Sequence, residues 1–157
     1  MDLYWIPLGA GQRVVEISGR IYEAASAMVR RRPRCDLYHS ALIAQMPEGC
    51  VVVEMTPIPD GRGRTDRGVV AEGPVGTRWA QRFRVFRYEI RRWHGGTIPD
   101  LPYAVSSPIR LTDDPVTVQR VLDLVAGVPT PVWGRDDFRT GEMWNSNSVT
   151  SWVLTRA

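Results

Sequence analysis

Three side chains that could act together in acyl transfer lie far apart in the sequence. His39 lies in the run LYHSALIA, Glu54 in the apolar run CVVVEMTP, and Ser148 at the end of the polar run WNSNS. A serine becomes a nucleophile when an imidazole takes its proton and a carboxylate orients that imidazole. We therefore treat these residues as a candidate nucleophile, base and orienting carboxylate.

The same residues also have a structural interpretation. His39 would be a half-buried strand residue with a satisfied hydrogen bond, and Glu54, which is costly to bury alone, would pair with an arginine. Ser148 precedes residues at helical spacing, so we predict that it is the N-cap of a C-terminal helix. A nucleophile at that position would also be favoured by the positive end of the helix dipole. Both interpretations remain open.

The other reactive residues offer weaker candidates. His94 is followed by Gly95-Gly96, which predicts a solvent-facing turn. Cys50 could replace a missing thiol, but it lies on a predicted hairpin with no cation or helix start beside it. Two cysteines in 157 residues form neither a disulfide framework nor a zinc pattern. We expect reduced thiols, no metal and no organic cofactor.

Composition predicts one domain over residues 1–157, since 43% hydrophobic content over this length can bury a core. No apolar run approaches the roughly 20 residues of a membrane-spanning helix. The N-terminus has no basic region of the secretory kind, so we expect a cytoplasmic protein. The chain ends three residues after Leu154, inside what the pattern predicts to be an unfinished helix, which suggests a truncated C-terminus.

Charge gives little indication of a partner. The net charge is +3, and all twenty basic residues are arginine. Acidic residues are mixed among them, and the densest group, over 30–34, is typical of a helix end before Pro33. We therefore expect no nucleic-acid partner; the sequence does not predict the oligomeric state.

The elements that must position the candidate site follow an α+β order. We expect an edge strand over 3–8, a helix from Ser18 to Pro33, and two strands over 37–44 and 50–57 that pair as a hairpin. Alternation places His39, Ala41 and Ile43 on one face of the first hairpin strand. A mobile loop is expected over 57–68.

Further along, VVAEGPVG predicts a short strand and turn, and residues 83–93 alternate as a half-buried strand. Residues 97–112 are Pro-rich and irregular. Asp114 and Pro115 predict a helix start, with Gly127 as its end. A loop around Trp133, over 129–143, leads to the C-terminal helix. The expected architecture is a small antiparallel sheet packed against helices.

Three short motifs resemble the circularly permuted branch of the papain-like NlpC peptidase superfamily, which includes YiiX-like proteins and lecithin:retinol acyltransferase. YHSALI over 38–43 is similar to the family's strand that opens with the catalytic His, and VVEM over 52–55 to the next strand with its polar partner. WNSNSVTSW is similar to the family's Asn-Cys helix start. The order of elements agrees across nearly the whole chain, and it implies a permuted papain-like fold.

The resemblance implies a site in which Ser148 replaces the family's cysteine, with His39 as base and Glu54 as its partner. Ser146 is the nucleophile in the other register, and Asn145 or Asn147 would help backbone N–H groups to stabilise an oxyanion. A Cys-to-Ser change is also what a family member that had lost catalysis would show.

Two functions follow. The chain is either a Ser-His-Glu hydrolase or acyltransferase of amide, thioester or ester bonds, or a catalytically inactive papain-like domain. The inactive domain would bind a peptide, lipid or protein partner in a groove lined by three tryptophans: Trp133, Trp144 and Trp152.

Overall fold

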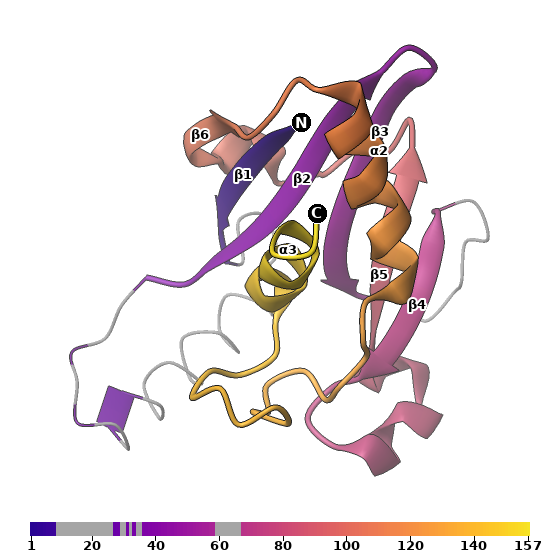
Figure 1. Ribbon diagram of the computed structural model, residues 1–157. Coiled ribbons are helices and arrows are strands. Elements are labelled where there is room, and N and C mark those ends of the chain that lie inside the picture. The colour runs from indigo at the N-terminus through magenta and orange to yellow at the C-terminus, as the bar shows by residue number, and fades with distance from the viewer. Residues whose placement is uncertain (9–26, 29–30, 32, 34–35, 59–66) are drawn as a thin grey trace.

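A six-stranded antiparallel sheet forms the centre of the molecule (Figure 1). The computed structural model describes residues 1–8, 27–28, 31, 33, 36–58 and 67–157. The strand order is β4-β5-β3-β2-β1-β6. The strands are β1 Asp2–Pro7, β2 Tyr38–Met46, β3 Gly49–Pro57, β4 Val69–Pro74, β5 Arg87–His94 and β6 Val105–Arg110.

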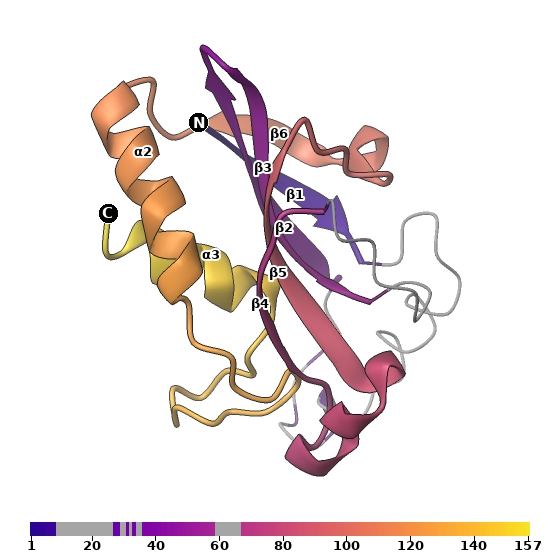
Figure 2. The same cartoon turned by 90° about the vertical axis from the view of Figure 1, so that its right-hand side faces the viewer.

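Two helices cover one face of this sheet, as Figure 2 shows. They are α2 Pro115–Leu124 and α3 Ser146–Leu154. Both bury their apolar side chains in the main core, where they meet Leu42, Val53 and Ile90 of the sheet. Four short 3-10 helices complete the described elements: η1 Arg78–Arg82, η2 Arg84–Phe86, η3 Leu101–Tyr103 and η4 Val125–Gly127.

Strand alternation divides the side chains of β2 between the two faces. Leu42 and Ala44 belong to the core beneath the helices, and Ser40 donates a hydrogen bond of 2.9 Å to the Thr150 hydroxyl of α3. Ala41 and Ile43 belong to a smaller cluster on the opposite face. The sheet is therefore a barrier between two separate environments.

Several sequence predictions are confirmed. The architecture is α+β, and β2 and β3 pair as the expected hairpin. Helix α2 begins at Pro115, and the Asp114 carboxylate caps it by accepting from the backbone N–H groups of Val116 and Thr117. Asp114 carries a lowered pKa, chiefly because the Thr117 hydroxyl donates to its carboxylate.

Three predictions about strands were wrong. β1 is not an edge strand, because it lies between β2 and β6. The segment expected to be irregular contains β6, and Pro108 is tolerated there because an edge strand needs fewer N–H donors. Residues 83–86 do not begin β5, since the chain turns through η2 there and the strand starts at Arg87.

The predicted half-buried character of β5 was also wrong, because both of its faces are buried: Tyr88 and Ile90 face the helices, and Glu89 and Arg91 are buried on the other side. Helix α3 ends at Leu154, with Thr155 as its C-cap. Within the described ranges, no helix is long and apolar enough to cross a membrane. Most of the helix expected over 18–33 and of the loop expected over 57–68 lies outside the described residues.

Candidate functional site

The N-terminus of α3 differs from the prediction by three residues. The N-cap is Asn145, not Ser148, and Ser148 is the third helical residue. The Asn145 side chain accepts from the Ser148 N–H at 3.1 Å, and the Ser148 hydroxyl accepts from the Asn145 N–H at 3.2 Å. This reciprocal pair is a capping box, in which two N–H groups left unpaired by the helix are satisfied.

Ser148 and Asn147 make further hydrogen bonds, and Ser146 is buried. The Ser148 hydroxyl also donates to the Met143 carbonyl at 3.2 Å. The Asn147 amide nitrogen donates to the Tyr38 carbonyl at 3.1 Å, which ties the helix to the beginning of β2. Ser146 is only 4% exposed and lies on the buried face of α3, toward the sheet. The Asn147 amide nitrogen, the group that would donate to an oxyanion, is thus engaged by Tyr38, whereas the Asn145 side-chain oxygen acts as the N-cap acceptor.

His39 lies on the other side of the sheet. Its register partner on β1 is Ile6, and directly paired residues share a face. Ile6 belongs to the smaller cluster that faces away from the helices. The half-buried imidazole pairs through Nε2 with the Asp100 carboxylate at 3.0 Å.

The structure therefore does not bring the predicted nucleophile and base together. Ser40, the neighbour of His39, points to α3 and bonds Thr150, so the His39 side chain points away from that helix. Ser146 and Ser148 both belong to α3 on the opposite face. A base must reach its nucleophile directly or through one water, and here a sheet separates them.

Glu54 lies on the same face of the sheet as His39 but forms an ion pair with a different residue. Its carboxylate is 6% exposed and accepts from the Arg91 guanidinium at 2.9 Å. Burial raises the pKa of Glu54, while Arg91 and, more weakly, His39 act to lower it. The imidazole is held by Asp100 instead, a residue that the sequence did not indicate because it lies in an irregular Pro-rich stretch.

Glu54 is one member of a larger buried charge cluster, which we define as Glu54, Arg67, Glu89 and Arg91. The Arg91 Nε donates to Glu89 at 2.9 Å, and Arg67 donates to the other Glu89 oxygen at 2.9 Å. All four side chains are nearly inaccessible to solvent. Each carboxylate thus has a cationic partner, as burial requires.

A groove lies on the solvent side of α3, beside the capping box. It encloses about 590 Å³, within the range of about 300–1,000 Å³ for ligand sites. We call it the α3 groove. Its lining includes Phe138, Met143, Trp144, Ser148, Ser151 and Trp152. Two of the three predicted tryptophans line it, whereas Trp133 packs against the core, edge-on to Tyr88 with ring centroids 5.8 Å apart.

The loop that forms one wall of the α3 groove is held by its own hydrogen bonds. The Asp136 carboxylate accepts from the N–H groups of Thr140 and Gly141, both at 2.8 Å, and these bonds lower its pKa. The backbones of Arg135 and Trp144 pair where the loop closes. The wall is therefore preformed, which lowers the entropy cost of binding.

The remaining candidates have structural or exposed positions. His94 is exposed, as predicted, but it is the last residue of β5, and the turn begins at Gly95. Cys50 is a free thiol, and burial raises its pKa, which leaves less of the reactive thiolate. Within the described part of the chain, no group of His, Cys, Asp and Glu side chains is arranged to hold a metal ion.

Comparisons with known proteins add no relative. No protein-family model matches the chain, and neither a curated protein nor a solved structure matches it. The resemblance to the permuted papain-like superfamily therefore depends on the three sequence motifs alone.

Proposed function

We propose that this chain is a catalytically inactive domain of the permuted papain-like kind, which binds a peptide segment of a protein partner in the α3 groove. The observation that carries the proposal is the separation of His39 from Ser146 and Ser148 by the sheet. With serine in place of cysteine and no base beside it, the helix start keeps a capping role.

The chemistry of the α3 groove favours a peptide. The exposed ring of Phe138 and the partly buried ring of Trp152 offer apolar surface, and Phe138 stands edge-on to the buried Trp144 with centroids 5.6 Å apart. Charges of both signs, including Arg135 and Asp136, lie along the same groove. Aromatic anchors with a mixed polar rim are typical of protein recognition surfaces.

The catalytic alternative is tested with a fluorophosphonate probe. Intact-mass analysis should show no adduct on the folded chain, because neither Ser146 nor Ser148 has a base to activate it. An adduct on either serine that disappears in His39→Ala would contradict the proposal. Denatured protein, which lacks any assembled site, gives the background labelling.

Binding is tested by selecting a phage-displayed random peptide library on the immobilised chain. Peptides that are enriched should bind in the α3 groove, so Ser151→Arg, which fills it from an exposed helix position, should weaken their binding at least tenfold. Gln119→Arg adds the same charge on the exposed side of α2 and should leave binding unchanged. Failure to enrich any peptide, or equal binding by both variants, would reject the groove as a peptide site.

A further inference from the structure

A second surface, between β4 and β5, has the character of a membrane contact. The chain between β4 and β5 forms η1 and η2, which project beyond the ends of these strands in both views (Figures 1 and 2). We call residues 78–86 the tip. It carries four large apolar side chains that are 46% to 70% exposed: Trp79, Phe83, Val85 and Phe86. So many apolar groups in nine residues mark an interaction surface.

The tip is also strongly basic. Residues 77–87, TRWAQRFRVFR, contain four arginines and no acidic residue. Two of them have acidic partners, since Arg78 lies 3.7 Å from Asp137 and Arg87 lies 3.3 Å from Glu72. Neither Arg82 nor Arg84 makes an ion pair with another described residue, and both are exposed. Their charge is available to an anionic surface.

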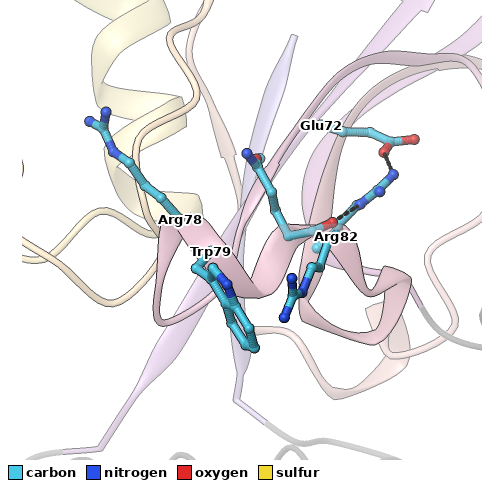
Figure 3. A pocket seen from close by; sticks show the side chains of 7 residues that line it. Glu72, Arg78, Trp79 and Arg82 are labelled. Carbon is cyan, nitrogen blue, oxygen red and sulfur yellow. Dashed lines mark hydrogen bonds and ion pairs between the residues drawn. The ribbon is translucent and has the colours of Figure 1, made fainter.

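Hydrogen bonds where the tip joins β4 and β5 fix its backbone. Thr77 caps η1 by accepting from the Ala80 N–H, and the Val75 N–H donates to the Phe86 carbonyl at 2.9 Å. The Arg87 side chain donates to the Gln81 carbonyl as well as to Glu72. These contacts fix the backbone that carries the apolar side chains, and Figure 3 shows the Trp79 side chain next to that of Arg82.

The geometry points to an anionic lipid bilayer as the occupant of the tip, and we propose that the tip inserts at its surface. Trp and Phe favour the membrane interface, and arginine can extend its guanidinium to the headgroups while its stem stays among apolar chains. The excess positive charge complements anionic headgroups.

Single-stranded nucleic acid suits the tip less well. Base stacking needs open ring faces, but the Arg82 guanidinium lies 3.5 Å from the centre of the Trp79 ring. The Phe83 ring meets Trp79 edge-on, with centroids 6.1 Å apart. Val85, the most exposed of the four apolar side chains, has no flat face to offer a base.

Vesicle co-sedimentation tests the proposal with the whole chain. Binding to phosphatidylcholine vesicles with about 30% phosphatidylserine should exceed binding to phosphatidylcholine alone and should weaken as salt is added. Arg82→Gln with Arg84→Gln should weaken it about 30-fold, from about 1 kcal/mol for each basic residue near the surface. Arg120→Gln with Arg139→Gln removes the same charge from exposed positions elsewhere and should have no comparable effect.

The apolar contribution is tested by Phe83→Ser with Val85→Ser, which should weaken binding at least tenfold. Val116→Ser is the matched control, because Val116 is 76% exposed on α2. A blue shift of tryptophan emission on these vesicles should be lost in Trp79→Phe and kept in Trp152→Phe. Equal binding to both kinds of vesicle, or tip variants that bind like their controls, would overturn the proposal. Binding of a deoxythymidine oligonucleotide that only the tip variants lose would assign the tip to nucleic acid instead.

Discussion

The two faces of the sheet are stabilised by different forces. Under α2 and α3 the contacts are mainly apolar, with Leu42, Val53 and Ile90 packed against the helices. The opposite face combines a small apolar cluster around Ala41 and Val52 with the buried charge cluster and the His39–Asp100 pair. Apolar packing is insensitive to pH, whereas buried charges need every partner in place. Substitutions on the two faces should therefore differ in size and in pH dependence.

The largest effect is expected from Arg91→Met. This change leaves the Glu54 and Glu89 carboxylates buried without the guanidinium that joins them, and breaking such a pair costs about 3–5 kcal/mol. Arg92→Met is the matched control, because Arg92 points to the helix face and is partly exposed, with a carbonyl partner at Leu122. Its cost should be about 1 kcal/mol or less. Urea unfolding measures both, and equal losses would contradict the division between the faces.

A smaller loss is expected when the α3 cap is removed. Asn145→Ala should lower the free energy of unfolding by about 1 kcal/mol, because the Ser148 N–H and the Asn145 side chain lose their mutual bond. Ser151→Ala, at an exposed position of the same helix, should change it by less than about 0.5 kcal/mol. Thermal and urea unfolding compare the two. An Asn145→Ala variant as stable as Ser151→Ala would show that the cap does not stabilise α3.

The smallest effect is a change in pH dependence from Glu54→Gln. Burial raises the pKa of Glu54 in the folded chain above its unfolded value, so the folded chain binds this proton more tightly. The contribution of Glu54 to the free energy of unfolding is thus greatest when its carboxyl group is protonated. This contribution falls as the pH rises from the pKa of the unfolded chain, about 4.3, through the raised pKa of the folded chain. Arg91 stays paired with Glu89 in the variant, which keeps the effect small.

The measurement is Tm from about pH 4 to about pH 8 for the wild type, Glu54→Gln and the exposed control Glu48→Gln. As the pH rises through the lower part of this range, the Tm of the wild type should fall relative to that of Glu54→Gln. At higher pH the difference between the two Tm values should stay constant. A difference that grows in favour of the wild type as the pH rises would mean that Arg91 outweighs burial at Glu54.

The hairpin and α2 were predictable because their signals are local. Residues 47–49 are turn-forming residues between two apolar runs. Asp114 followed by Pro115 is a helix-start signal wherever it occurs in a fold. Alternation also placed His39, Ala41 and Ile43 together on one face of β2, as found. Period 2 predicts which residues share a face.

The site was less predictable because it depends on which face a remote helix covers. Nothing in the sequence near WNSNS says that α3 packs on the Ser40 side of β2, so His39 and Ser148 were expected to meet. The choice of Asn145 over Ser148 as N-cap depends on where the preceding loop closes. The sequence did not predict the tip, because apolar and charged residues alternate over 83–93 and this alternation predicted a strand that includes 83–86. In the structure, contacts of Thr77 and Arg87 hold this part of the chain in turns.

The most direct test of the central claim is disulfide trapping across the sheet. In a background with Cys35→Ser and Cys50→Ser, His39→Cys is combined with Ser148→Cys or Ser146→Cys, and Ser40→Cys with Thr150→Cys serves as the control. Disulfides need Cα atoms within about 7 Å and side chains that face each other. The control pair replaces two hydroxyls 2.9 Å apart and should oxidise readily, while both His39 pairs should stay reduced. A His39 pair that closes as fast as the control would place imidazole and serine on one face and restore the catalytic interpretation.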